Sequence, residues 1–354
     1  MVTEARATPI AVRRVDIWPK VVSAVGLLLV AAVIAWLIVN WVKSPETFYT
    51  SLFVGVTLGA LYGLVALGYT LVYGILELIN FAHGDVFMLG AMISATMLIS
   101  VFGLESNPSI SLLVPAIFGS LGVAVFACSL LNAAVEKIAY RPLRGAPRLV
   151  PLITAIGMSF ILEGIALIWK GPGYVSLPIR ILPSGTVFAI GGASFQWGKL
   201  IVILITVPVL IGLIWLVRYT RQGKAMRATA QDRDAAAMMG ISVDRTISFT
   251  FLVAGALAGV AGIVYALYVG NIRYDQGFQL GLISFTAAVL GGIGNLTGAL
   301  LGALLIGLIQ AFNEGLSWHA PGASWTTSVV FAILILILVF RPAGLLGEQT
   351  PEGQ

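Results

Sequence analysis

Long apolar segments, almost free of charge, limit what this chain can fold into more than any other feature. A helix needs roughly 20 consecutive apolar residues to cross the hydrocarbon core of a bilayer. Segments of about that length recur along the whole sequence, at 21–42, 50–76, 86–102, 111–135, 150–169, 199–217, 246–270, 280–312 and 325–340.

The composition agrees with a membrane protein. Hydrophobic residues make up 59% of the chain and charged residues 10%, whereas a soluble domain carries about 25% charged residues. The apolar runs are continuous, while the strands of a membrane β-barrel alternate between apolar and polar residues. The sequence therefore predicts an all-α polytopic membrane protein with about 8–10 transmembrane helices, including broken or re-entrant segments.

Most of the basic residues lie before the first apolar segment and in the loops after the fourth, the sixth and the last. Lys and Arg are enriched in cytoplasmic loops. This rule predicts cytoplasmic tails at 1–20 and 341–354 and an additional transmembrane helix at 21–42. The main transmembrane domain is predicted at 50–340, with a cytoplasmic loop at 218–245 and an external loop at 170–198. The net charge of +5 is spread over separate loops, which argues against a nucleic-acid partner.

This topology requires segment 280–312 to cross the membrane an even number of times. The sequence GGIGN, with Gly291, Gly292 and Gly294, interrupts it. Two short helices or a re-entrant hairpin would satisfy the requirement, and broken helices are typical of transport pathways. We therefore take these three glycines as candidates for the translocation path.

Several kinds of active site have no support in the sequence. There is no GxxxxGK[ST] phosphate loop, the two histidines have no metal-ligand spacing, and no Ser/His/Asp or Cys/His set is suitably placed. We expect no enzyme, no metal and no cofactor in this chain.

Between the second and third apolar segments, Glu77, Asn80, His83 and Asp85 occur close together. One interpretation is an interfacial turn, in which Asn80 or Asp85 caps a helix and the charges face water. The other is a polar element that enters the helix bundle and lines a path for a solute. Position alone favours the interfacial turn.

Glu163 lies well inside the fifth apolar segment. An acid at such a depth costs about 2.5–3.5 kcal/mol on insertion scales, so it should face the bundle interior or water. Either Glu163 lines a path, or the helix begins later than residue 150 and Glu163 is shallower.

The loop at 218–245 concentrates charge in a chain that has little. Asp232 or Asp234 can cap a short helix through Ala235–Met239, and Gly240 suits the position that ends it. Ala235, Met238 and Met239 would then form an exposed apolar tip that fits a partner's groove. An ordinary solvated loop is the alternative.

Two patterns concern packing. In the external loop, two short apolar runs joined by Gly191-Gly192 predict a β-hairpin, with a passive loop as the alternative. Small residues at a spacing of four allow helices to approach closely in lipid; they are Gly55, Gly59 and Gly63, then Gly255 and Gly259, then Gly294, Gly298 and Gly302.

From about Leu52 to Gly347 the sequence resembles the branched-chain amino acid permease family of ABC importers, in its shorter membrane-subunit type. The resemblance rests on GALYGLVALGYTLVYGILELINFAHGDVFMLGA, YRPLRGAPRLVPLITAIGMSFIL, GKAMRATAQDRDAAAMMGISVDR, FTAAVLGGIGNLTGALLGALLIG and FRPAGLLG, in that order. It departs from the shortest members in the additional span at 21–42 and in Glu163, where we expect an uncharged polar residue.

The resemblance implies that loop 218–245 is the coupling loop, which seats in a cleft of a separate ATPase subunit that hydrolyses ATP. The docking helix would be Ala235–Gly240, including Ala236, Met238 and Met239, with Arg227 and Asp232 beside it. The resemblance also implies a second, related permease subunit, an external solute-binding protein and the bacterial inner membrane.

The implied cargo is a branched-chain or related small amino acid. Urea, short amides and aromatic acids are alternatives within the family. An ATP-independent secondary transporter or channel is the alternative class, and it would need a chain of ionisable groups within the membrane.

Overall fold

The computed structural model describes residues 18–347, except 148, 179–180, 184 and 342. The chain forms two compact units, Met1–Pro45 and Glu46–Gln354, and we describe each separately. Residues 1–17 and 348–354, which belong to the predicted cytoplasmic tails, lie outside the described residues.

The described part of the first unit, from residue 18 on, contains one helix, α1 (Trp18–Lys43), of 26 residues. At 1.5 Å per residue it is about 39 Å long, enough to cross a bilayer. Its apolar side chains are widely exposed; for example, Leu27 is 72% and Val42 69% exposed. A helix therefore covers the segment predicted at 21–42.

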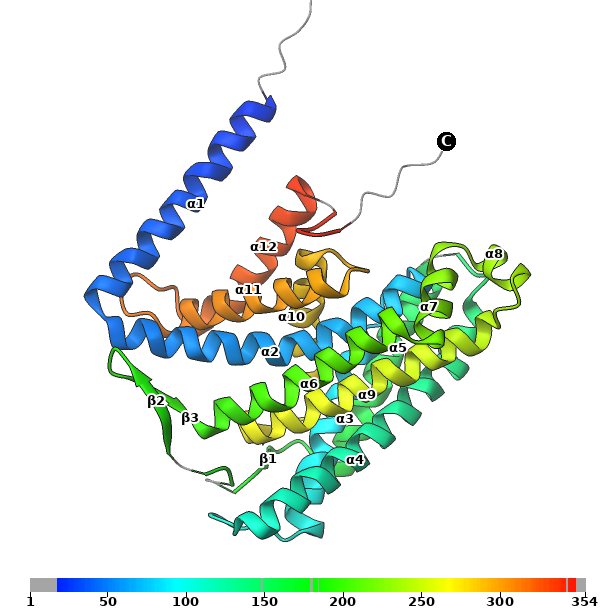
Figure 1. Ribbon diagram of the computed structural model, residues 1–354, viewed down its shortest axis with the longest axis horizontal. Coiled ribbons are helices and arrows are strands. Elements are labelled where there is room, and N and C mark those ends of the chain that lie inside the picture. The colour runs from blue at the N-terminus through cyan, green and yellow to red at the C-terminus, as the bar shows by residue number, and fades with distance from the viewer. Residues whose placement is uncertain (1–17, 148, 179–180, 184, 342, 348–354) are drawn as a thin grey trace, which may run out of the picture. The chain divides into compact units, whose positions relative to one another are not determined.

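The second unit is a bundle of helices (Figure 1). They are α2 (Pro45–Leu76), α3 (Ala82–Thr96), α4 (Ile110–Val135), α5 (Leu149–Lys170), α6 (Trp197–Tyr219), α7 (Arg221–Gln231), α8 (Arg233–Met238), α9 (Val243–Val269), α10 (Gln276–Gly291), α11 (Leu296–Gly315) and α12 (Thr326–Phe340). A π-helical turn follows α3 at Met97–Val101, and another follows α4 at Glu136–Tyr140.

Length and composition allow 9 of the described helices, α1 among them, to cross a membrane. The helix α10, with 16 residues, is apolar but too short to be counted among these spans. The predicted all-α polytopic class is therefore confirmed.

Small residues bring the helices of the bundle together. Figure 1 shows α3, α4 and α9 side by side. A side chain at Gly255 or Gly259 of α9 would meet the backbone of α4, and one at Gly59 of α2 would meet the backbone of α11. The predicted close packing is confirmed at these positions, whereas Gly294 lies in a loop and not in a helix.

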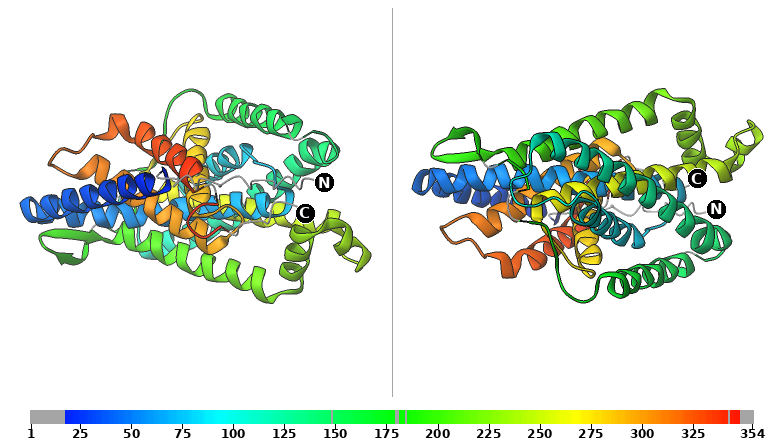
Figure 2. Two further views of the ribbon diagram at one scale, coloured as in Figure 1. Left: turned by 90° about the horizontal axis from the view of Figure 1, so that it is seen from above. Right: turned by 90° about the horizontal axis from the view of Figure 1, so that it is seen from below.

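One end of the bundle carries α7 and α8, and we call it the α8 end. The opposite end carries an antiparallel hairpin of β2 (Thr186–Ile190) and β3 (Ala193–Gln196), joined by Gly191-Gly192, and we call it the hairpin end (Figure 2). The predicted hairpin is confirmed and the passive-loop alternative is wrong. Phe188 stacks on Phe195 with ring centroids 4.8 Å apart, which ties the two strands together.

A second strand pair lies at the hairpin end, where β1 (Val175–Ser176) pairs with β4 (Asn271–Ile272). This short pair connects the segment after α5 with the segment between α9 and α10.

Segment 280–312 breaks where GGIGN predicts, between the end of α10 and the start of α11. Asn295 is the N-cap of α11, and its side chain accepts a hydrogen bond from the Gly298 N–H at 3.0 Å. The chain after α12 also holds the break in place, because Leu346 N–H donates to the Gly291 carbonyl at 2.9 Å. The two helices bring the chain to the α8 end and back, as the parity argument required.

Candidate functional site

The chain between α2 and α3 starts in solvent and ends in the core. Glu77 is exposed and adopts a left-handed conformation (φ 54°), whereas Asn80 is 1% exposed and both His83 and Asp85 are 0% exposed. The interfacial-turn interpretation is therefore wrong for the three buried residues. The reason is that α3 begins at Ala82. His83 and Asp85 therefore belong to a helix that packs on its neighbours and do not lie in a turn facing water.

Neither residue predicted as a cap acts as one. The N-cap of α3 is Phe81, with no side-chain cap, and Asp85 lies within the first turn. The side-chain oxygen of Asn80 instead accepts a hydrogen bond of 2.9 Å from the hydroxyl of Tyr140. Asn80 thus ties the loop to the π-helical turn that follows α4.

Asp85 is held between three helices. The hydroxyl of Ser159 in α5 donates to one carboxylate oxygen, Oδ2. The other oxygen, Oδ1, is buried and has no hydrogen-bond partner among the described residues. It lies against Gly277 in the first turn of α10, where an added Cβ would be 2.9 Å from the Asp85 Cα. Only glycine at position 277 allows this approach.

Asp85 is a buried acid whose negative charge is disfavoured by desolvation and favoured only in part by two helix N-termini. It stands in the first turn of α3 and beside the first turn of α10, and helix N-termini carry a partial positive charge. His83, two residues before Asp85, packs its ring against Tyr69 with centroids 5.0 Å apart. No group of three His, Cys, Asp or Glu side chains within the described ranges is arranged to hold a metal ion.

Glu163 follows Ser159 by one helical turn on α5, so the two side chains share a face. The helix starts at Leu149, so the alternative in which it begins later than expected is wrong. Glu163 is half-buried and interacts electrostatically with Asp85 and with Asp275. We call Asn80, His83, Asp85, Ser159 and Glu163 the polar cluster.

Asp275 borders the polar cluster at the hairpin end. It forms an ion pair with Arg273, whose Nε lies 2.5 Å from Oδ1 of Asp275. The hydrogen bond from Arg273 holds the pKa of Asp275 below its usual value, and the same carboxylate raises the pKa of Arg273. The guanidinium also lies 5.5 Å from the ring centroid of Tyr174.

The glycines of GGIGN do not join the polar cluster. Gly291 and Gly292 are buried against Gly298 and the segment around Leu346, and Gly294 is exposed. They form a tight loop at the α8 end, next to Gly74 near the end of α2. The predicted path residues therefore fall in three places: Glu77 at the surface, the polar cluster in the core, and this loop.

The predicted short helix in loop 218–245 is α8, and it is capped at both ends. The side chain of Asp232, not Asp234, accepts hydrogen bonds of 2.9 Å from the N–H groups of Asp234 and Ala235. Gly240 takes a left-handed conformation (φ 82°) that ends the helix, and the Ile241 N–H donates to the Ala236 carbonyl. Six residues, too few for a stable isolated helix, are thus held in place.

The two faces of α8 differ sharply. Met238 and Met239 are 81% and 84% exposed, whereas Ala236 is 4% exposed. Arg227, on the preceding α7, turns back to donate to the Val217 carbonyl at the end of α6. Among the residues predicted to dock a partner, the methionines and Gly240 face outward, Ala235 is half-buried and Ala236 faces inward. Arg227 and Asp232 hold the local structure.

The family described as the permease component of branched-chain amino acid transport systems matches residues 51–339. The chain belongs to this family. It is 38% identical to the high-affinity branched-chain amino acid permease protein BraD of Pseudomonas aeruginosa over 315 residues, which cover 87% of this chain and 99% of BraD. It is 39% identical to LivH of Escherichia coli K12 over 310 residues, covering 86% of this chain and 97% of LivH.

More distant similarities extend beyond that group. The autoinducer 2 import permease protein LsrC of Escherichia coli is 27% identical over 196 residues, covering 54% of this chain and 55% of LsrC. A solved metal-chelate type ABC transporter in an inward-facing conformation is similar with a TM-score of 0.44 and 16% identity over 92% of this chain and all of the other.

The family match contains both candidate regions of the permease, the polar cluster and α8, and it begins after α1. Some residues of these regions escaped sequence reasoning. Ser159, Tyr140 and Gly277 touch the predicted polar residues from other helices. The local signal for this contact was the spacing of four between Gly277 and Gly281, which follow Asp275. The helix α7 was not predicted, although Met226 and Thr229 lie buried on one of its faces.

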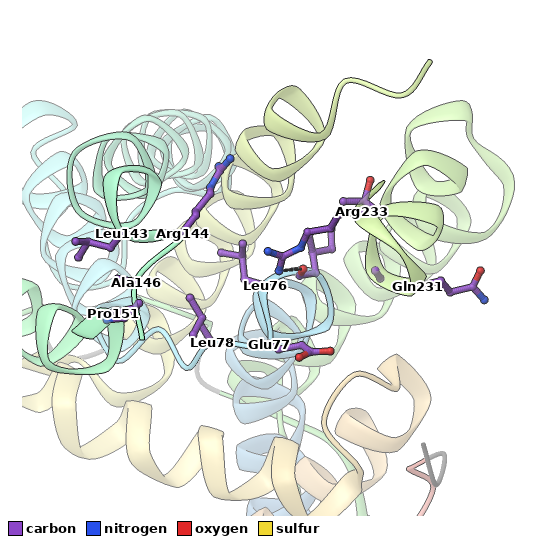
Figure 3. A pocket seen from close by; sticks show the side chains of 12 residues that line it. Leu76, Glu77, Leu78, Leu143, Arg144, Ala146, Pro151, Gln231 and Arg233 are labelled. Carbon is purple, nitrogen blue, oxygen red and sulfur yellow. Dashed lines mark hydrogen bonds between the residues drawn. The ribbon is translucent and has the colours of Figure 1, made fainter. Parts of the chain in front are cut away.

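A pocket of about 280 Å³ lies at the α8 end of the permease (Figure 3). The residues that line it are Ile75–Leu78, Leu143, Arg144, Ala146, Pro151, Thr229, Ala230, Gln231 and Arg233. Arg144, on one wall, pairs with the buried Glu136 and with Asp244 at the start of α9. Arg233, on another, donates a hydrogen bond of 2.8 Å to the Ile75 carbonyl.

Proposed function

We propose that this permease is the membrane subunit of an ATP-driven importer for branched-chain amino acids, and that a separate ATPase subunit docks on α8. One observation carries the proposal: α8 is a short helix, capped at both ends, that presents Met238 and Met239 to solvent. Apolar side chains as exposed as these mark a surface for a partner. Methionine adapts its shape to a groove, and the rigid caps fix where the pair is presented.

The ATP chemistry belongs to the partner. The sequence has no phosphate loop of its own, so the energy of ATP binding and hydrolysis must enter through a protein contact. A related second permease subunit would complete the pathway across the membrane.

The proposed orientation places the α8 end in the cytoplasm, because Lys and Arg are enriched on that side. The basic residues at this end are Lys137, Arg141, Arg144, Arg218, Arg221, Lys224, Arg227, Arg233, Arg245 and Arg341. At the hairpin end the second unit has Lys170, Lys199 and Arg273. The C-terminus then lies in the cytoplasm, and the β2–β3 hairpin faces a solute-binding protein outside.

The polar cluster is the proposed contact for the amino acid's ammonium group. Asp85 keeps one carboxylate oxygen without a partner among the described residues, and Glu163 lies within electrostatic range of both Asp85 and Asp275. A cationic group satisfies such a site, whereas an anionic aromatic acid is repelled and urea or an amide has no charge to neutralise. This arrangement favours amino acids over the other solutes considered.

The test is purification of the tagged permease from its native membrane, followed by identification of the proteins bound to it and by uptake in vesicles. A phosphate-loop ATPase should accompany the wild type and a Met239→Leu control, which keeps an apolar side chain. Met239→Arg should lose the ATPase and ATP-driven uptake, because it places a charge in an apolar contact. A permease that purifies alone and still carries leucine in vesicles without ATP would establish the secondary-transporter class instead.

A further inference from the structure

Arg233 joins the docking helix to the end of a membrane helix. It is the first residue of α8, and its guanidinium reaches across the pocket to the backbone carbonyl of Ile75. Figure 3 shows this side chain extending from the wall formed by Gln231 and Arg233 towards Leu76. Ile75 lies in the last turn of α2, where backbone carbonyls have no partner within the helix. Arg233 therefore acts as a C-terminal cap of α2 that is supplied by α8.

The capped turn leads directly into the polar cluster. Glu77 follows it in a left-handed conformation, and within the next eight positions the chain reaches Asn80, His83 and Asp85. Asn80 is anchored by Tyr140, and Asp85 by Ser159. The path from the exposed methionines to the buried carboxylate is thus short: α8, Arg233, the end of α2, the loop and the first turn of α3.

The connection is polar and lies beside empty space. The pocket of about 280 Å³ separates α7 and α8 from the loop at Glu77 and from the segment around Ala146. A shift of α8 can therefore pull on the end of α2 through the guanidinium without first repacking side chains in this space. Side chains packed in a filled core would resist such a shift.

We propose that Arg233 is a positioning residue that transmits displacement of α8 to the loop at Glu77 and to the polar cluster. The inference rests on the proposed function, in which α8 is the site where an ATPase acts. Arg233 does not dock the ATPase itself, because its side chain points to α2 while the methionines point to solvent.

The test compares Arg233→Ala, Arg233→Lys and a matched control, Arg221→Ala, in the intact complex purified with its ATPase and reconstituted in vesicles. Arg221 lies exposed on α7 and supplies the same loss of charge at the same end. We expect Arg233→Ala to keep the ATPase bound and hydrolysing ATP, while uptake per ATP falls about tenfold, the effect of losing one hydrogen bond to a charged group. Arg233→Lys keeps a donor and should fall between wild type and Arg233→Ala.

Hydrogen–deuterium exchange gives a second readout that does not require transport. Exchange at residues 77–81 should rise in Arg233→Ala and stay at the wild-type level in Arg221→Ala. Two results would overturn the inference: unchanged uptake per ATP with unchanged exchange in Arg233→Ala, or loss of the ATPase itself, which would make Arg233 a docking residue.

If the wild-type complex shows no ATP-driven uptake, the proposed function fails, and exchange decides about Arg233 separately. A rise confined to residues 77–81 would support its contact with α2, and no rise would overturn it.

Discussion

The tip of α8 and the first turn of α3 differ in which kind of side chain they expose and which kind they bury. Met238 and Met239 of α8 are apolar and more than four-fifths exposed, whereas His83 and Asp85 of α3 are polar and fully buried. Both arrangements cost free energy in an isolated chain, since exposed apolar area and unpaired buried charge are each unfavourable. Binding of another molecule offsets this cost if it covers the apolar area or pairs with the charge.

The two regions differ in what that other molecule must be. The methionines need an apolar groove, which a folded protein partner provides. The carboxylate of Asp85 needs a hydrogen-bond donor or a cation, which a small amino acid provides through its ammonium group. Under the proposed function, α8 contacts the ATPase and Asp85 contacts the amino acid.

The largest expected effect separates the two faces of α8. Ala236→Arg forces a charge into a site that is only 4% exposed, which should destabilise the packing of α8 by about 3 kcal/mol. Met239→Arg changes a side chain that is 84% exposed, so stability should stay within about 0.5 kcal/mol of the wild type. Thermal unfolding in detergent, together with limited proteolysis at α7 and α8, measures the difference. Equal destabilisation by the two variants would contradict the assignment of an inner and an outer face.

The next effect concerns the charge of the polar cluster. Asp85→Asn keeps the size of the side chain and can still accept from Ser159, so the fold should persist while leucine uptake falls about tenfold. Ser159→Ala is the matched control, because it removes the hydrogen bond and keeps the carboxylate. Glu163 is half-buried, and Glu163→Gln should lower leucine uptake less than Asp85→Asn does. Equal loss of uptake in Asp85→Asn and Ser159→Ala would mean that Asp85 serves packing and not the cargo.

The two regions also differ in how far sequence reasoning reaches. The helix α8 was predicted because its signals are local: Asp232 caps it from two and three residues away and Gly240 ends it. The membrane helices were predicted for a similar reason, since long apolar runs fix them; the expected 325–340 is α12 at Thr326–Phe340.

The polar cluster depends on contacts that no local pattern encodes. Ser159 is 74 positions from Asp85, and Gly277 lies further still along the chain. The burial of His83 depends on its packing against Gly68 and Tyr69 of α2. The helix α3 was therefore expected to start at residue 86, with polar residues outside it, whereas tertiary packing extends it to Ala82.

The smallest expected effect lies at the entrance to the polar cluster, where Asp275 and Arg273 are 29% and 39% exposed. The hydrogen bond from Arg273 lowers the pKa of Asp275 in the folded chain below the reference value of 3.8. The pair therefore stabilises the fold above pH 3.8, and this contribution is lost as the pH falls through the lower, folded-state pKa. Exposure to solvent keeps the contribution small.

Asp275→Asn should lower the midpoint of thermal unfolding slightly at neutral pH, and the difference from wild type should shrink as the pH falls below the reference value of 3.8 and through the lower folded-state pKa. Glu105→Gln, at an exposed acid of the same end, controls for the general loss of a negative charge. A difference that grew on acidification would have the opposite sign, and it would mean that Asp275 is protonated more readily in the folded chain than in the unfolded one.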